Sequence, residues 1–131
     1  MKRVRAIIKK NNSILLIHRI KKDREYWVFP GGGVEKSDAN QKNALIRECK
    51  EELGVDVSVG SLFAVKKFNG VDEYFYFCEI IKGELGTGFG PEFQEGTNYE
   101  GEYILEWISF KEFSLKNIQP ESIKEKLNNF Y

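Results

Sequence analysis

The chain has 131 residues, of which 41% are hydrophobic and 14% aromatic, and its 20 basic and 20 acidic side chains cancel to a net charge of zero. This length builds one domain with a hydrophobic core and is too short for two, so we expect a single domain over residues 1–131. Zero net charge gives no overall field to attract nucleic acid or a membrane surface, and no apolar stretch approaches the length that spans a bilayer.

The N-terminal residues are basic, and their apolar run is too short for a signal sequence. Cys49 and Cys78, the two cysteines, form neither a disulfide framework nor a metal-binding spacing, and both are expected to be small buried hydrophobes. His18 is the single histidine, which excludes a metal site built from several histidines. We expect a cytoplasmic monomer or homodimer, without a membrane partner and without extended nucleic-acid binding.

Alternating apolar residues predict strands through most of the chain. Residues 4–9 and 13–19 flank an Asn11-Asn12 turn and are expected to form a hairpin. A short aromatic strand, residues 26–29, then runs into Pro30 and three glycines. Later strands are expected at residues 56–59, 62–68, 73–81 and 104–108, with a turn at Gly70 between the second and third of these.

Two helices are expected among these strands. The first runs from Asp38 to Leu53, with Ser37 or Asp38 as its N-cap, and ends at Gly54 in a left-handed conformation. Its apolar seam predicts that three side chains are buried, those of Leu45, Cys49 and Leu53. The second begins at Pro120, and its apolar face carries Ile123, Leu127 and Phe130. Strands interleaved with two helices indicate an α/β (α+β) fold, a mixed sheet covered on both sides.

Three glutamates share one face of the first helix. Because each helical residue advances about 100°, Glu52 lies about 40° to one side of Glu48 and Glu51 about 60° to the other. Glu48 and Glu52 repel each other at this i,i+4 spacing. A solvated face would usually include lysines, yet Lys50 points to the opposite side. Arg47 can pair with Glu51, which leaves Glu48 and Glu52 unneutralised and favours a hard divalent cation bound by carboxylate oxygens.

The same segment resembles the signature of the Nudix hydrolases, the MutT-like family, which runs Gly-x5-Glu-x7-Arg-Glu-(apolar)-x-Glu-Glu-x-Gly-(apolar). The second half matches at every specified position, at Arg47, Glu48, Cys49, Glu51, Glu52, Gly54 and Val55. The first half differs, because Asp38 stands where the family has glutamate, and eight residues instead of seven separate it from Arg47. We interpret this as a one-residue insertion in the turn before the helix.

The resemblance implies a Nudix α/β/α sandwich, in which the helix that carries the signature (the box helix) and the C-terminal helix flank a mixed central sheet. It implies a pyrophosphohydrolase that cleaves a phosphoanhydride bond in a nucleoside diphosphate linked to another moiety, with Mg²⁺ or Mn²⁺ as cofactor. Glu48 and Glu52, together with the carbonyl of Gly31, would bind the metal ion. Glu51 would be a third ligand or the general base, and Arg47 would fix the rotamer of Glu51.

Two further groups of residues are candidates for contact with a nucleotide substrate. Arg19 ends the second strand, where the family commonly uses an arginine to contact phosphate, although a lone arginine is also a common surface charge. Tyr26, Trp27 and Phe29 alternate on the aromatic strand. Some of these rings must be core, while one outward ring, that of Tyr26 or Phe29, could stack on a nucleobase.

The segment of residues 82–102 fits neither a strand nor a helix, because it holds six of the 12 glycines and five glutamates. Loops of this length inside a compact domain are usually functional or mobile. It is either a surface flap or a lid that brings a further acid to the site. By resemblance that acid, a candidate catalytic residue, is Glu100, with Glu102 and Glu95 as the other candidates.

Two other functions remain open. One is a non-catalytic Nudix-like module that senses a nucleotide, although such modules generally have a degraded box and an attached DNA-binding domain. The other is an RNA 5′-end pyrophosphohydrolase, which zero net charge and the lack of a basic stripe disfavour. A free nucleotide or nucleotide sugar is the preferred substrate.

Overall fold

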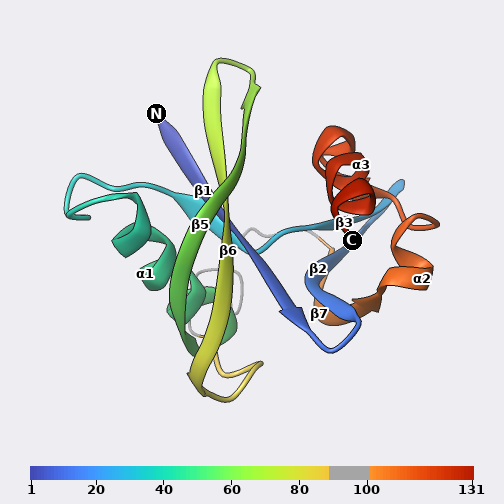
Figure 1. The fold of residues 1–131 in the computed structure, drawn as a ribbon, viewed down its shortest axis with the longest axis horizontal. Coiled ribbons are helices and arrows are strands. Elements are labelled where there is room, and N and C mark those ends of the chain that lie inside the picture. The colour runs from blue at the N-terminus through green and yellow to red at the C-terminus, as the bar shows by residue number, and fades with distance from the viewer. Residues whose placement is uncertain (89–100) are drawn as a thin grey trace.

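The computed structural model describes residues 1–88 and 101–131, which form a curled sheet with helices on either side (Figure 1). Strands predominate because β-branched and aromatic residues alternate with polar ones along most of the chain. In chain order the elements are β1 (Lys2–Lys10), β2 (Ser13–Lys21), β3 (Arg24–Val28), β4 (Gly31–Gly33), α1 (Gln41–Leu53), β5 (Val55–Phe68), β6 (Val71–Gly83), β7 (Glu102–Ser109), α2 (Phe110–Phe113), β8 (Ile118–Gln119) and α3 (Glu121–Phe130).

The sheet is mixed, and β1 lies at its centre. The first part of β1 pairs in parallel with β6 and antiparallel with β4. Its last two residues, Lys9 and Lys10, pair instead with β2, which continues the sheet to β3 and β7. Because β1 changes partners along its length, it joins two groups of strands, and the glycine strand β4 lies beside its first part. The predicted mixed sheet is confirmed.

Two hydrophobic cores cover the two faces of this sheet. Successive residues of a strand point to opposite faces, so Leu15 of β2 enters the first core while Ile14 and Leu16 enter the second. Helix α1 packs on the first core and α3 on the second. Figure 1 shows α1 on one side of β5 and β6, with α2 and α3 on the other. The predicted α/β/α arrangement is therefore confirmed.

The apolar seam of α1 is buried as the sequence predicts. Leu45, Cys49 and Leu53 are each 0% exposed, and burying a leucine side chain contributes about 1.5–3 kcal/mol. Burial raises the pKa of the Cys49 thiol well above its ordinary value and that of Cys78 to about 12. Both cysteines are therefore protonated and act as small buried hydrophobes, as expected.

The predicted start of α1 is wrong, whereas its predicted end is confirmed. The helix begins at Gln41, and its N-cap is Asn40, whose side chain accepts from the Asn43 N–H at 2.8 Å. Asparagine caps a helix as well as aspartate does, and Asp38 is engaged elsewhere. At the other end Gly54, with a φ of 81°, donates its N–H to the carbonyl of Lys50.

The middle strands are longer than expected. The two strands predicted at residues 56–59 and 62–68 form the single strand β5, because β-bulges on either side of Leu62 keep it paired with β6. Asn69 and Gly70 join β5 to β6 with φ values of 51° and 77°, the conformation of a two-residue hairpin turn. The turn predicted at Gly70 is therefore confirmed.

The C-terminal helix buries two of its three predicted apolar residues. Ile123 and Leu127 are buried, but Phe130 is 59% exposed. Phe130 is the last residue of α3, and its ring lies against Phe63 and Phe77 at the margin of the second core. The predicted apolar face therefore docks on the sheet with all three residues, although Phe130 at its end stays partly exposed.

The long glycine-rich segment is only partly described. Lys82 and Gly83 still belong to β6, and Glu102 begins β7. Two of the three candidate loop acids, Glu95 and Glu100, lie outside the described residues. In the part of the chain that the structure describes, no helix is long and apolar enough to cross a membrane.

Candidate active site

The glycine strand β4 brings its backbone against the acidic face of α1. A Cβ atom on Gly31 would overlap the carbonyl of Val4, and one on Gly32 would overlap the carboxylate of Glu48. Glycine therefore allows β4 to approach β1 closely at Gly31 and the helix closely at Gly32. The Gly31 N–H donates to Oε1 of Glu52 at 2.8 Å, so the glycine turn and the glutamates form one unit.

Arg47 is the centre of the ion pairs on α1. Its Nε and Nη2 donate to the two carboxylate oxygens of Asp38, each at 3.0 Å, and Nη2 also donates to the carbonyl of Gly33 at 3.0 Å. Its Nη1 donates to Glu48 and to Glu51, each at 3.2 Å. The predicted pair with Glu51 is confirmed. The expectation that Glu48 is left unneutralised is wrong, because one guanidinium reaches both carboxylates.

Asp38 is the main partner of Arg47 and not a helix cap. Their hydrogen bond holds the pKa of the Asp38 carboxyl below its ordinary value and is the largest cause of the raised pKa of Arg47. The Asp38 side chain is only 6% exposed. Sequence reasoning missed this role. The signal that could have revealed it is an acidic residue at the position of the first glutamate of the motif.

Glu52 is the buried member of the acidic face, with 7% exposure. Its Oε1 accepts from the Gly31 N–H, and its Oε2 accepts from the hydroxyl of Tyr103 on β7. The ring of Tyr103 lies 4.9 Å from the guanidinium carbon of Arg19, and Arg19 Nε donates to the Glu102 carbonyl at 3.1 Å. Tyr103 belongs to no motif, so the sequence carried no signal for this contact.

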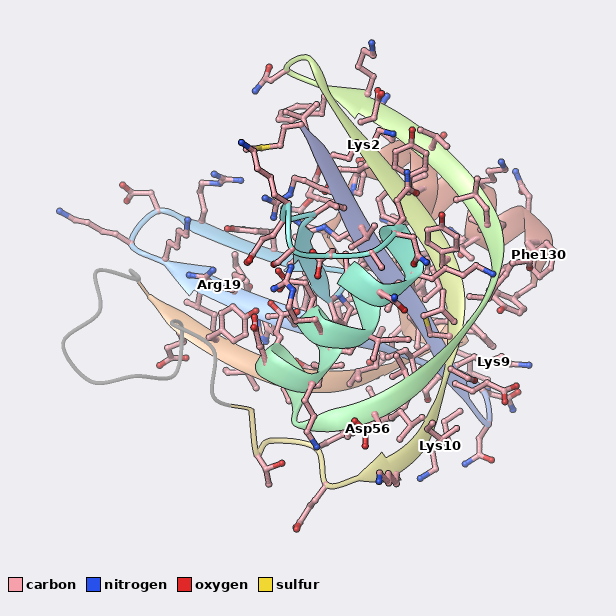
Figure 2. All side chains as sticks on the ribbon, turned by 90° about the vertical axis from the view of Figure 1, so that its left-hand side faces the viewer. Lys2, Lys9, Lys10, Arg19, Asp56 and Phe130 are labelled. Carbon is pink, nitrogen blue, oxygen red and sulfur yellow. The ribbon has the colours of Figure 1, made fainter. Side chains whose placement is uncertain are left out.

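A cavity of about 410 Å³ is lined by Gly31, Glu52, Arg19 and Tyr103, among other residues. Figure 2 views the molecule from the side of α1 and labels Arg19, which lies on β2. The glycine strand β4 and the carboxylates of α1 form one part of the lining, and arginines from β1 and β2 form another. The charged residues of this lining are Glu35, Glu48, Glu51, Glu52, Arg3, Arg5 and Arg19.

A second cavity, of about 230 Å³, adjoins the first. Arg5, Tyr26 and Val28 line both, and aromatic and apolar side chains such as Phe75 and Pro120 complete the second. Arg5 is held at this junction by Glu73, whose carboxylate accepts from Arg5 Nε at 2.8 Å. The larger cavity is therefore highly charged and the smaller one mainly apolar.

The structure brings together most of the side chains that the sequence singled out. Glu48, Glu51 and Glu52 line the larger cavity, and so do Gly31, Arg19 and Tyr26. Phe29 does not join them as a stacking ring, because it is 1% exposed and packs edge to face on Phe75 in the second core.

The donors around the cavity fit a hard cation, since Glu48, Glu52 and backbone carbonyls of β4 offer only oxygen. Among residues 1–88 and 101–131, no three histidine, cysteine or acidic side chains form a group ready to hold a metal ion. The carboxylates instead accept from protein donors, Glu48 from Arg47 and Glu52 from Gly31. Mg²⁺ sites in proteins commonly use one or two carboxylates together with water and substrate phosphates.

Known proteins resemble this chain in sequence or in structure. CTP pyrophosphohydrolase of Escherichia coli (strain K12) is 43% identical over 63 residues, which are 47% of this chain and 46% of that protein. The mRNA-decapping enzyme subunit 2 of Saccharomyces cerevisiae (strain YJM789) is 29% identical over 138 residues, covering 95% of this chain and 12% of that protein. The chain thus spans less than half the length of these two relatives.

The solution structure of the E. coli ORF135 protein superposes with a TM-score of 0.65 at 28% identity, covering 98% of this chain and 87% of that one. The family model described as NUDIX domain matches residues 1–127, nearly the whole chain. Since that match includes the glycine strand, the acidic helix and β7, we conclude that the chain belongs to the NUDIX domain family.

Proposed function

We propose that the chain is a divalent-metal-dependent pyrophosphohydrolase, which cleaves a phosphoanhydride bond in a nucleoside diphosphate linked to another moiety. The observation that best supports this function is that three carboxylates of α1 and three arginines line one cavity of about 410 Å³. A diphosphate uses both kinds of group, because its oxygens pair directly with guanidinium groups and pair with carboxylates through a divalent cation.

Glu48 and Glu52 would hold the cation, with the Gly31 carbonyl as a further oxygen donor. The closeness of Gly32 to Glu48 supports this assignment. A Cβ on Gly32 would overlap the Glu48 carboxylate, so the backbone of β4 can lie next to that carboxylate only because the residue is glycine. When bound, Mg²⁺ or Mn²⁺ would neutralise phosphate charge and make water easier to ionise.

Glu51 is the residue of α1 that we propose as general base. Its carboxylate lines the cavity, is 31% exposed and is held by Arg47 Nη1 at 3.2 Å. A base must lie within hydrogen-bond reach of the water that it deprotonates and keep a fixed orientation. Arg47, itself fixed by Asp38 and Gly33, would supply that orientation. Glu100 remains the alternative base, with Glu102 and Glu95 behind it.

On the opposite side, Arg19 would bind phosphate oxygens, together with Arg3 and Arg5 on β1. The adjoining cavity of about 230 Å³ is lined by aromatic and apolar side chains and suits the nucleoside end of a substrate. Tyr26 lines both cavities, which supports its ring as the one that would stack on a nucleobase. The resemblance to CTP pyrophosphohydrolase supports a free nucleotide as substrate.

The test is a hydrolysis screen of the purified protein with Mg²⁺ or Mn²⁺ against nucleoside triphosphates, dinucleoside polyphosphates, ADP-ribose and capped RNA. We expect phosphate-containing products from at least one free nucleotide, and loss of turnover when EDTA removes the cation. Hydrolysis of capped RNA alone would assign an RNA 5′ end as substrate in place of a nucleotide.

Two variants make the screen specific for the site. Glu52→Gln keeps the shape of the side chain but removes a charge from the proposed metal ligands, so turnover should fall by about 100-fold or more. Glu125→Gln is the control, because this residue is exposed on α3, on the opposite face of the sheet. No hydrolysis of any compound, or equal turnover in Glu52→Gln and the unaltered protein, would contradict the proposed function.

A further inference from the structure

Tyr103 connects the two oppositely charged sides of the cavity. In the antiparallel pairing of β2 with β7, Tyr103 lies directly opposite Arg19. Its ring is 4.9 Å from the Arg19 guanidinium carbon, and its hydroxyl donates to Oε2 of Glu52 on α1. One side chain thus contacts a proposed phosphate-binding residue with its ring and a proposed metal ligand with its hydroxyl.

The hydroxyl contact matters because a carboxylate rotates easily about its terminal bond. Glu52 has a donor on each oxygen, the Gly31 N–H on Oε1 and the Tyr103 hydroxyl on Oε2. Two donors from different strands fix the plane of the carboxylate at a site that is 7% exposed. A carboxylate can accept about four hydrogen bonds, so accepting from these donors is compatible with binding a cation as well.

The ring contact matters because an arginine side chain has several rotatable bonds and is costly to order. The face of the Tyr103 ring attracts the guanidinium of Arg19, while the Glu102 carbonyl accepts from Arg19 Nε at 3.1 Å. Both contacts come from adjacent residues of β7. The strand therefore sets where the guanidinium lies before a phosphate arrives.

We propose that Tyr103 is a positioning residue with two separable roles, one through its hydroxyl and one through its ring. The hydroxyl orients Glu52 for a divalent cation, and the ring orients Arg19 for phosphate. This inference depends on the proposed function, since it assigns a metal ligand and a phosphate contact in the same cavity.

Two substitutions separate the roles. Tyr103→Phe removes the hydroxyl and keeps the ring, so we expect the Kd for Mn²⁺ to rise by about tenfold, the usual effect of losing a group that orients a ligand. The KM for a nucleotide at saturating Mn²⁺ should change by less than about twofold. Tyr103→Leu removes both contacts, so we expect the same change in Kd and a KM about threefold higher.

The Kd is measured without substrate, by calorimetric titration of each protein with Mn²⁺, so it does not depend on turnover. Tyr76→Phe is the matched control, because it also removes a tyrosine hydroxyl that donates to a side chain, Gln41, but does not line the cavity. Its Kd and KM should equal those of the unaltered protein. Circular dichroism verifies that each variant is folded.

A double-mutant cycle tests the route through Arg19. In an Arg19→Gln background, Tyr103→Phe and Tyr103→Leu should have the same KM, because the partner of the ring is gone. If their KM values still differ threefold, the ring acts elsewhere and its assigned role is wrong. This comparison needs Tyr103→Phe and Tyr103→Leu both alone and in the Arg19→Gln background.

The outcomes separate this inference from the proposed function. If the unaltered protein binds Mn²⁺ and hydrolyses a nucleotide but Tyr103→Phe has the same Kd, the inference is wrong and the proposed function stands. If the unaltered protein neither binds Mn²⁺ nor hydrolyses any nucleotide, both are wrong. A raised Kd in Tyr103→Phe that Tyr76→Phe does not share supports the role of the hydroxyl.

Discussion

The pairing of Asp38 with Arg47 should stabilise the fold by an amount that depends on pH. Asp38→Asn keeps one acceptor oxygen and removes the charge. A hydrogen bond to a charged group contributes about 1.5–3 kcal/mol, but Arg47 is 23% exposed, which weakens the pair. Arg47 also keeps Gly33, Glu48 and Glu51, so no buried charge is left alone. We therefore expect a loss of about 1–2 kcal/mol, or about 3–8 °C in Tm.

The stabilisation by this pair should decrease as the pH falls. The pKa of Asp38 is lower in the folded protein than in the unfolded chain, so the pair stabilises the fold above the unfolded pKa of about 3.9 and is lost as pH falls through the lower, folded value. The Tm difference between Asp38→Asn and the unaltered protein should therefore be complete at pH 6–7 and shrink below about pH 4.

Thermal melts followed by circular dichroism across this pH range check both points. Asp56→Asn is the control, because the ion pairs of Asp56 are long and exposed. Its carboxylate oxygens lie 3.8 Å from the ammonium of Lys50 and 3.7 Å from that of Lys82. Its cost should stay below about 0.5 kcal/mol. Equal Tm values for Asp38→Asn and the unaltered protein at pH 7, or an undiminished Tm difference at pH 3, would show that this pair does not stabilise the fold in the way described.

Three further predictions concern the site. Glu52→Gln should leave Tm without metal within about 2 °C of the unaltered protein, and a larger fall in a thermal melt would contradict this. The amide oxygen can still accept from Gly31, its NH2 can donate to the Tyr103 hydroxyl, and the repulsion with Glu48 is removed. Arg47→Ala should lower kcat more than it raises KM, since Arg47 orients Glu51 and does not line the cavity; steady-state kinetics with a raised KM and unchanged kcat would assign it to phosphate binding. The three loop glutamates to be changed to glutamine are Glu95, Glu100 and Glu102. At saturating Mg²⁺ one of these variants should have a kcat about 100-fold lower than the unaltered protein. Full activity in all three variants would leave Glu51 as the base.

The box helix was readable from the sequence because its signals are local. Helical spacing alone places Leu45, Cys49 and Leu53 on one face and the three glutamates beside it, and both placements hold in the structure. The glycine at its end and the Asn69-Gly70 turn were equally readable, since each needs a positive φ that glycine adopts without strain. The helix start was not, because Asn40 and Asp38 are both good caps, and the choice depends on where Arg47 reaches.

The opposite side of the cavity was decided only by the tertiary structure. Arg3 and Arg5 look like part of a basic N-terminus, and they reach the site because β1 pairs with β4 and β6, the latter about seventy residues away in sequence. Tyr103 and Glu52 are 51 positions apart in the sequence. They meet only because β7 pairs with β2. Strand periodicity tells which residues share a face but not which strands are neighbours. The sequence by itself therefore determined the apolar seam and the acidic face of the helix, whereas the pairing of distant strands determined what lies opposite that face.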